Sequence, residues 1–420
     1  MADDERPLSA PRGTFDLFPP QTWERLALTR LFFELTGAAG YEPVETPVFE
    51  HTEVFERGVG EASEVVTKQM YTFTDLGGRS LTLRPEGTAG VVRAVLERGT
   101  ERAALPFKLS YAGWMFRQER PQKGRYRQFF QLGIETIGTE DPRADAEVVE
   151  LGARLLAVAG VEARLLVNSI GHPDASCRSG YVDDLAAFLR RVQDELAPED
   201  RARIATNPLR TFDSKEEATR RALAAAPLLA ERLCDACRKH FDEVLALLGD
   251  AGVAFELEPR LVRGLDYYTR TAFEFVAEDL GAQATVLAGG RYDGLSEQLG
   301  GPRLPGVGFA AGLERMLLAS RGIEDAAPAP DVYVVALGER AQRAAFALAT
   351  SLRAQGLGVL FDLAGRGLKG QLKDAARVGA RYAALLGDDE LAAGEVTLKD
   401  LFSGEQERVA MDELAGRLGR

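Results

Sequence analysis

The chain has 420 residues, 45% of them apolar, and a formal net charge of −13. This length suits two or three domains with a sizeable core, and no apolar run approaches the ~20 residues that span a bilayer. The acidic balance argues against a protein that coats nucleic acid non-specifically, because phosphate binding requires lysine and arginine. Local basic patches are still compatible with a specific RNA partner.

Cysteine and histidine are both scarce. Three cysteines are an odd number in a long chain, which suits a reducing cytoplasm better than a disulfide framework; they are Cys177, Cys234 and Cys237. The N-terminal residues are charged and contain proline, so they do not form a secretory signal, and we expect a cytoplasmic protein with no membrane partner. Three histidines leave few candidates for a histidine base or a multi-histidine metal site.

Apolar periodicity and the positions of glycine and proline place the elements of the first half. In chain order we expect a helix over 21–40, extended chain over 41–49, a strand over 81–83 and a helix over 89–97. Two longer strands, over 108–119 and 125–137, are expected to form a hairpin with a basic, flexible tip at 120–124.

A helix-rich stretch follows over about 174–250. We interpret it as an insertion, because strand-like sequence resumes after it. The later elements are strands near 271–276, 284–288 and 306–310 and a helix over 313–320. Together they indicate an α+β domain over residues 1–325, built on an antiparallel sheet flanked by helices.

The composition changes at Ala326-Ala327-Pro328-Ala329-Pro330, which we interpret as a linker over 326–330. Beyond it, strands over 332–337, 358–361 and 382–386 alternate with helices over 342–355 and 368–378. Such alternation predicts a small α/β domain over 331–420 with a largely parallel sheet.

The hairpin carries the clearest chemical pattern. Strand side chains alternate between faces, so one face should hold Arg125, Arg127, Phe129, Gln131, Gly133 and Glu135, with Arg117 on the partner strand. Cations near the tip, an amide midway and a carboxylate deeper in suit a substrate with a phosphate at one end and a small polar group at the other. Gly133 would leave room for that ligand. The alternative is a solvated basic hairpin with ordinary cross-strand pairs.

Two later segments have a functional and a structural interpretation. Arg263, followed by Tyr267 and Tyr268, could bind an anion and a polar ring of a ligand. Alternatively, these residues form the start of a strand whose tyrosines pack in the core. The paired glycines of Ala288–Gly294 permit close approach to a ligand, or form a turn.

A glycine-rich strand over 306–312 runs into a helix that begins with Glu314 and Arg315. Arginine at a helix start is unfavourable against the macrodipole, and an anionic ligand would compensate for it. The sequence contains neither a P-loop nor a GxGxxG turn after a strand, so a nucleotide is not held in either of those ways.

Cys234-x-x-Cys237-x-x-His240 suggests zinc. However, three ligands on one helix cannot complete a tetrahedral site alone, and Cys177 is far away in the sequence. We therefore expect buried helix cysteines and no structural metal.

Residues 366–381 hold five basic residues and one acid, Asp374. Four of the basic residues are spaced four apart, which on a helix places them along one stripe: Lys369, Lys373, Arg377 and Arg381. A charge run of this kind is usually a solvated surface. The functional alternative is that these residues contact RNA.

Together these segments resemble the histidyl-tRNA synthetases, a family of class II aminoacyl-tRNA synthetases, over essentially the whole chain. Residues 12–19 look like the family's N-terminal opening, and residues 41–49, 116–125 and 306–315 are similar to class II motifs 1, 2 and 3. The motifs give only the class. LVRGLDYYT at 261–269 and AGGRYDGL at 288–295 look like the histidine-specific signatures.

The resemblance implies roles for individual residues. Arg117 would hold the ATP α-phosphate and Arg315 the β- and γ-phosphates, Arg125 is a further ATP-binding candidate, and Arg263 would face the α-phosphate and the carboxylate during adenylation. Arg117 and Arg263 are thus the catalytic candidates. The histidine-binding candidates are Glu86, Gly87, Thr88, Gln131, Glu135, Tyr267, Tyr268 and Tyr292. Among them, Glu86, Thr88 and Gln131 look like holders of the α-amino group, and Glu135 and Tyr268 look like readers of the imidazole.

One departure from the family is that Phe130 stands where many members have histidine. By alternation we expect Phe130 to point away from Gln131, with little effect on the pocket.

The resemblance implies an enzyme, histidine–tRNA ligase, that uses ATP with Mg²⁺ to convert L-histidine to histidyl adenylate and loads it onto the 3′ end of tRNA(His). It further implies a homodimer formed through motif 1 and an anticodon-binding role for residues 331–420. The alternative is a non-catalytic, histidine-sensing regulatory paralogue of the first enzyme of histidine biosynthesis. Such paralogues generally lack the anticodon-binding domain and some catalytic residues. A plain RNA-binding module would leave the Gln131 and Glu135 face unexplained.

Overall fold

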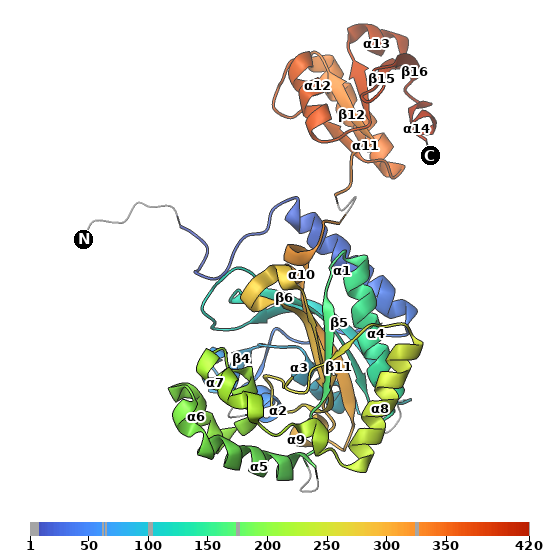
Figure 1. The fold of residues 1–420 in the computed structure, drawn as a ribbon. Helices are drawn as coiled ribbons and strands as arrows, with labels where there is room; N and C mark the ends of the chain where they lie inside the picture. Colours follow the sequence, from blue (N-terminus) through green and yellow to red (C-terminus); the bar gives the residue numbers. More distant parts are fainter. Residues whose placement is uncertain are drawn as a thin grey trace, which may run out of the picture. The chain divides into compact units, whose positions relative to one another are not determined.

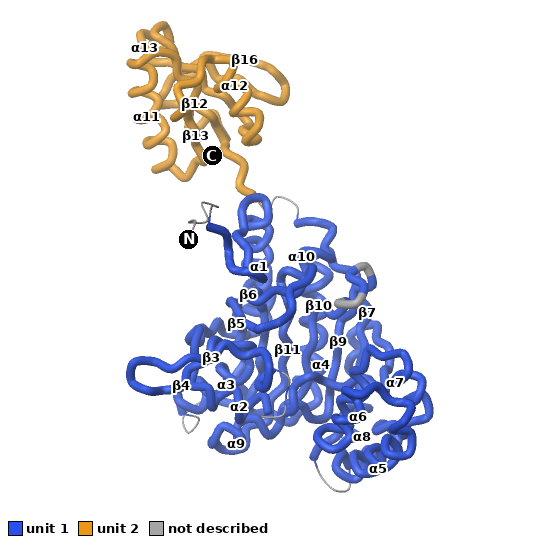
Figure 2. The backbone as a smooth tube through the Cα atoms, turned by 90° about the vertical axis from the view of Figure 1, so that its left-hand side faces the viewer, with its two compact units in different colours: residues 1–324 blue, residues 325–420 orange. Residues whose placement is uncertain are grey.

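The computed structural model describes residues 8–60, 63, 65–99, 104–173, 177–323 and 327–419. The chain divides into two compact units, residues 1–324 and 325–420, drawn in different colours in Figure 2. Residue 174, where the predicted insertion begins, and residues 325 and 326 at the predicted domain boundary and linker lie outside the described residues. Within the described ranges, no helix has the length and apolar character needed to cross a membrane.

An eight-stranded sheet forms the centre of the first unit, with the strand order β1-β5-β6-β11-β10-β9-β7-β8. The strands are β1 (Glu42–Pro43), β5 (Phe107–Phe116), β6 (Gln128–Ile137), β7 (Arg164–Ser169), β8 (Glu256–Leu257), β9 (Thr269–Val276), β10 (Thr285–Arg291) and β11 (Gly306–Gly312). All pairings are antiparallel except those of the short outermost strands β1 and β8. The predicted antiparallel sheet is confirmed.

Helices cover one face of this sheet (Figure 1). They are α1 (Gln21–Ala38), α4 (Pro142–Val158), α8 (Asp235–Asp250) and α10 (Leu313–Ala319). Phe130, Leu132 and Ile134 of β6 belong to the core between these helices and the sheet. Because strand side chains alternate, Gln131, Gly133 and Glu135 face the other way, which places the site on the opposite face.

A three-stranded sheet of order β2-β4-β3 lies in the N-terminal part. It consists of β2 (Phe49–His51), β3 (Tyr71–Thr74) and β4 (Ser80–Leu83), accompanied by helices α2 (Thr52–Val59) and α3 (Thr88–Arg98). The segment 41–49, predicted to be extended, is divided between β1 and the start of β2, so it joins the two sheets.

Between β7 and β8 the chain is mostly helical, as predicted. The helices before α8 are α5 (Arg178–Arg191), α6 (Pro198–Thr206) and α7 (Glu217–Ala222). Short helical turns occur at η1 (Val65–Gln69), η2 (Gln193–Glu195), η3 (Pro208–Asp213), η4 (Leu223–Ala225), η5 (Leu229–Glu231) and η6 (Glu278–Gln283), and α9 (Leu295–Gln298) follows β10. Residues of α5 to α7 pack in a second core with Tyr267 and Tyr268, whereas α8 packs on the main sheet.

The second unit has a five-stranded sheet of order β13-β12-β14-β15-β16. The strands are β12 (Val332–Ala336), β13 (Val359–Phe361), β14 (Tyr382–Leu386), β15 (Glu395–Asp400) and β16 (Gln406–Ala410), and the helices are α11 (Glu339–Ala354), α12 (Leu368–Arg377), α13 (Asp388–Ala393) and α14 (Leu414–Arg417). β12 pairs parallel with β13 and β14, and the last strands pair antiparallel. The sheet is therefore mixed and not largely parallel, since β15 and β16 were not recognised in the sequence.

Candidate active site

A cavity of about 310 Å³ opens on the face of the main sheet that α1 and α4 leave uncovered. Most of the predicted site residues line it: Glu86, Thr88, Arg117, Arg125, Gln131, Arg263, Tyr267, Tyr268 and Arg315. Three others do not, namely Gly87, Glu135 and Tyr292. Segments far apart in the sequence thus contribute to one cavity.

Four arginines line this cavity. The Nε of Arg117 donates to the carbonyl of Pro85 at 2.8 Å, and Arg125 forms an ion pair with Glu119. Arg315 donates to two backbone carbonyls, those of Gly124 and Thr285, each at 2.9 Å. Backbone carbonyls thus hold the guanidinium of an arginine that lies in the first turn of α10.

Crowding and burial lower the pKa of two of these guanidiniums. Desolvation is the main cause for both Arg117 and Arg315, and the neighbouring cations, including Arg125, add to it. Two of the four arginines are paired with carboxylates of the same cavity, Arg125 with Glu119 and Arg263 with Glu274.

Arg263 lies between a carboxylate and an aromatic ring. It forms an ion pair with Glu274 of β9, and its guanidinium carbon is 5.4 Å from the centroid of Tyr268. Glu274 also accepts a hydrogen bond from the hydroxyl of Thr285 at 2.9 Å. Glu274 was not singled out in the sequence, where only its position on a predicted strand was visible.

Hydrogen-bond acceptors line the same cavity. The carboxylate of Glu86 accepts from the backbone N–H groups of Thr88 at 2.8 Å and Ala89 at 2.9 Å, at the start of α3, and burial raises its pKa. The Oε1 atom of Gln131 is buried without a hydrogen-bond partner among the described residues. A buried acceptor of this kind is costly unless a donor reaches it.

Glu135 lies directly behind the cavity wall, with 1% of its surface exposed. Its two oxygens accept from the hydroxyls of Thr88 at 2.7 Å and Tyr292 at 2.5 Å. Burial, the largest cause, raises the pKa of Glu135 to about 8. The rings of Tyr267 and Tyr268 pack beside it with centroids 4.6 Å apart.

The prediction that Gly133 leaves room for a ligand is wrong. A Cβ atom on Gly133 or on Gly87 would overlap the ring of Tyr111, so these glycines accommodate a tyrosine of the protein. Tyr111 is the cross-strand partner of Gly133. A large side chain directly opposite a glycine is the signal that could have predicted this contact. In the same way, Gly308 accommodates the carboxylate of Glu135, its partner across β11 and β6.

The paired glycines of the Ala288–Gly294 segment do not form a turn. Gly289 and Gly290 lie inside β10, where side chains at these positions would collide with Phe273 and Tyr268. Arg291 is fully buried in an ion pair with Asp145, so it supports the fold and does not line the cavity.

The strands of the hairpin are shorter than predicted, ending at Phe116 and beginning again at Gln128. Alternation therefore does not extend to Arg125 and Arg127. Arg125 reaches the cavity from the loop, whereas the side chain of Arg127 donates to the backbone carbonyls of Arg12 and Glu119. Phe130 packs edge-on against Trp114 in the core, pointing away from Gln131 as expected.

Comparison with known proteins assigns the family. A family model described as "Histidyl-tRNA synthetase" matches residues 13–316. A protein of Corynebacterium kroppenstedtii named histidine–tRNA ligase is 49% identical over 422 residues, covering 98% of each chain. Its counterpart from Halothermothrix orenii is 46% identical over 97% of this chain and 98% of its own.

The chain belongs to the histidyl-tRNA synthetase family. It is accordingly an aminoacyl-tRNA synthetase, an enzyme that charges transfer RNA with histidine. The crystal structure of apo histidyl-tRNA synthetase from S. aureus agrees, with a TM-score of 0.82 and 36% identity over 98% of this chain and all of that one. A Bacillus halodurans structure titled as an ATP phosphoribosyltransferase regulatory subunit/histidyl-tRNA synthetase, at 23% identity and a TM-score of 0.64, shares the fold.

The second unit matches a family model described as "Anticodon binding domain" over residues 331–420. Of the four predicted RNA contacts there, Lys369, Lys373 and Arg377 lie on α12, and Arg381 lies beyond its end. All four are exposed. Arg377 forms an ion pair with Asp374 at 2.6 Å, and Arg381 stacks over the ring of Tyr382. The stripe predicted on one helix is therefore three residues long.

The structure contradicts both reasons for expecting no structural metal. His240 does not join Cys234 and Cys237, because its Nε2 lies 3.3 Å from Asp145 in the core. Cys177, although distant in sequence, lies close to both cysteines, together with a histidine that the sequence had not suggested as a ligand, His172. The four residues meet because the start of α8, which carries Cys234 and Cys237, lies next to the chain that follows β7.

Proposed function

We propose that the cavity binds ATP and L-histidine, joins them as histidyl adenylate, and presents the adenylate to the 3′ end of tRNA(His). The observation that carries this proposal is the lining of the cavity. It combines four arginines with a buried, unpartnered amide oxygen, tyrosines and carboxylates. ATP and an amino acid together present phosphates for the arginines and an ammonium group for the acceptors.

In the proposed reaction, the histidine carboxylate attacks the α-phosphate of ATP and pyrophosphate leaves. Arg117 and Arg263 are proposed to bind the α-phosphate, with Arg125 and Arg315 on the departing phosphates. Positioning and charge stabilisation dominate such a step, and guanidiniums already fixed by backbone carbonyls need little reorganisation.

Mg²⁺ enters this proposal as part of the ATP complex, where it would neutralise phosphate charge. The cavity contains carboxylates that suit such a hard cation, those of Glu119 and Glu274. In the described structure both are paired with arginines, so they can exchange one cationic partner for another.

The α-ammonium group of histidine is proposed to donate to Oε1 of Gln131 and to the carboxylate of Glu86. Gln131 gains the donor that it lacks. Glu86 is already oriented by two backbone N–H groups, so its ionised form is favoured once a cation arrives.

The imidazole is proposed to be read by Tyr268 and by the hydrogen-bonded pair of Thr88 and Glu135. Thr88 lines the cavity and Glu135 lies directly behind Thr88. A ring N–H of the bound histidine would therefore face these polar groups. An apolar analogue would leave these buried groups unpaired, and sites built in this way can reject such analogues by ~10⁴–10⁵. A separate editing site is unnecessary.

The test is ATP–pyrophosphate exchange measured with each of a panel of amino acids. We expect exchange that depends on histidine and is absent with glutamine, asparagine or phenylalanine. A chain that binds histidine but supports no exchange would instead be the non-catalytic regulatory paralogue.

The second unit is proposed to bind the tRNA, with the exposed cations of α12 on its backbone. A cavity of about 690 Å³ lies beside α11 and the ends of β12 and β13, with Gln371 of α12 in its lining, and supports this proposal. It is lined by Phe346, which is 60% exposed, and Phe361. Exposed aromatic rings next to cations are suited to stacking unpaired bases.

A homodimer is also proposed, formed through the segment that resembles motif 1. Val48 and Phe49 are exposed by 44% and 51%, and Phe49 meets the equally exposed Phe73 of β3 with ring centroids 6.3 Å apart. Contiguous exposed apolar side chains of this size mark a surface that another protein covers. A cytoplasmic location is the remaining expectation, and the three free cysteines fit a reducing compartment.

A further inference from the structure

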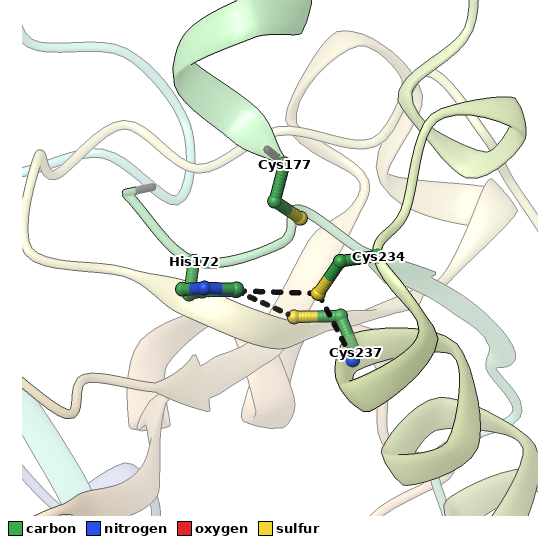
Figure 3. Close-up of side chains that lie close together, drawn as sticks. All are labelled: His172, Cys177, Cys234 and Cys237. Atoms are coloured by element: carbon green, nitrogen blue, oxygen red, sulfur yellow. Dashed lines mark hydrogen bonds between the residues drawn. The ribbon is translucent and has the colours of Figure 1, made fainter. Parts of the chain in front are cut away.

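Four side chains meet where the helical segment α5–α7 departs from the main sheet and returns to it. His172 and Cys177 lie between the end of β7 and the start of α5, and Cys234 and Cys237 open α8 (Figure 3). One donor atom from each residue lies within 4.8 Å of all the others. Among the residues that the structure describes, this is the one group of histidine, cysteine and acidic side chains with such an arrangement.

We propose that these four residues bind a structural zinc ion. Nδ1 of His172 is 2.9 Å from Sγ of Cys237 and 3.8 Å from Sγ of Cys234. Zn–S and Zn–N bonds of ~2.3 and ~2.0 Å place the donors of a tetrahedral site about 3.5–3.8 Å apart. Small side-chain movements therefore convert the observed cluster into a closed Cys₃His site.

The chemistry of the donors selects the metal. Three soft thiolates and an imidazole favour zinc over the hard cations Mg²⁺ and Ca²⁺, which require oxygen ligands. Four protein ligands leave no open position, which is typical of a structural and not a catalytic site. Cys177 and Cys237 are 2% and 0% exposed, so the ion would be shielded from solvent.

The surroundings of the cluster fit an anionic metal–thiolate centre. The backbone N–H of Cys237 donates to Sγ of Cys234 at 3.5 Å, the kind of contact that orients a ligating sulfur. Three thiolates exceed the charge of Zn²⁺ by one, and the buried guanidinium of Arg178 is close enough to Cys177 and Cys237 to interact with them electrostatically.

The ion would fasten the α5–α7 segment to the wall of the cavity. Arg178, next to Cys177, donates to the carbonyl of Tyr268 at 2.6 Å. On the other side of His172, Gly171 accepts from the N–H of Arg270 at 2.7 Å. Zinc would thus hold both ends of the segment beside Tyr268 and the start of β9. This inference does not depend on the proposed reaction, because it concerns metal content and stability.

The first experiment measures metal. The full-length chain is purified under reducing conditions without chelators, and its zinc is measured by inductively coupled plasma mass spectrometry. We expect about one zinc per chain, falling by at least tenfold in the double variant Cys234→Ser/Cys237→Ser and in His172→Gln. His51→Gln, which alters an exposed histidine elsewhere, is the matched control and should retain the full content. Zinc far below one per chain in the unaltered protein, or equal amounts in all four proteins, would refute the proposal.

A second measurement uses the unaltered protein alone, so it does not depend on whether the variants fold. Every cysteine of the chain belongs to the cluster. Titration with a mercurial reagent should release the zinc in proportion to thiol modification, and replacement with Co²⁺ should give the intense thiolate-to-cobalt absorption of a tetrahedral site. A Cys234–Cys237 disulfide found by mass spectrometry in the freshly reduced protein, or Co²⁺ spectra without thiolate bands, would contradict zinc binding.

Discussion

Arg263 is held by groups that a substrate can replace. Its ion pair with Glu274 and its contact with the Tyr268 ring keep the guanidinium over the cavity. An incoming carboxylate or phosphate competes with Glu274 for the same cation. The proposed role of Arg263 is therefore to stabilise charge in the transition state.

Replacing this guanidinium should remove the proposed chemistry without removing the amino-acid site. Arg263→Ala is expected to lower ATP–pyrophosphate exchange by at least about 10²-fold, the usual cost of losing one preorganised donor. Histidine analogues should still bind weakly, as measured by calorimetry. Arg260→Ala, three residues away and exposed, is the control. Near-normal exchange in Arg263→Ala would exclude Arg263 from the mechanism.

Glu135 links stability to pH. Its pKa is raised from 4.5 to about 8 in the folded protein, so between these values the folded state binds the proton more tightly than the unfolded state. The free energy of unfolding should therefore fall as pH rises through this interval. Denaturant titrations at pH 5 and pH 8 are expected to show a smaller loss of stability in Glu135→Gln than in the unaltered protein, by more than about 1 kcal/mol. Equal pH slopes in the two proteins would mean that Glu135 does not titrate in this range.

Which residues line the cavity could be predicted only in part from the sequence. Arg117, Gln131 and Tyr268 reach the cavity as the family resemblance implied. Tyr111 was missed, and Gly133 was misinterpreted, because the volume that a glycine leaves belongs to whichever side chain lies opposite it. A single sequence gives the glycine but not its neighbour across the sheet.

At the scale of elements, boundaries depended on long-range partners. β6 begins three residues later than its sequence suggests, since the backbone of Arg127 donates to Gly13, which lies more than a hundred residues earlier in the chain. α4 was overlooked although its start carries local signals. Asp141 caps it by accepting from the N–H of Arg143 at 2.9 Å, and Pro142 is its first residue.

The three-stranded sheet offers an element-scale test of the dimer. Phe49→Asp should place a charge in the exposed apolar surface formed with Phe73 and shift the protein from dimer to monomer in light scattering. Phe402→Asp, a substitution at an 84% exposed phenylalanine in the second unit, should leave the mass unchanged. A dimer that persists in Phe49→Asp would place the interface elsewhere.

At the scale of the whole molecule, each unit has its own hydrophobic core. The second unit is centred on Val334, Leu352 and Leu386, and the cores of the first unit are separate from it. This division and the composition change at the linker agree in position. The functional roles of the two domains stay predictions.

Separate cores make the roles testable by truncation. A chain that ends at Pro330 should keep histidine-dependent pyrophosphate exchange within a few-fold of the full chain but lose most tRNA charging. The milder change Lys369→Ala/Lys373→Ala should raise the KM for tRNA without altering exchange, and Lys239→Ala on the exposed face of α8 is its control. Normal charging by the truncated chain would mean that the second unit does not read the tRNA.

The order of strands also has a consequence for synthesis on the ribosome. β6 pairs with β5 as soon as both emerge, but its other edge is closed only by β11, whose residues 306–312 are made much later. Until then the nascent chain exposes an unpaired, largely apolar edge, a site at which chains associate wrongly. Chaperone contact is therefore expected to be strongest while the helical segment is being translated, and to end once Gly312 has left the exit tunnel.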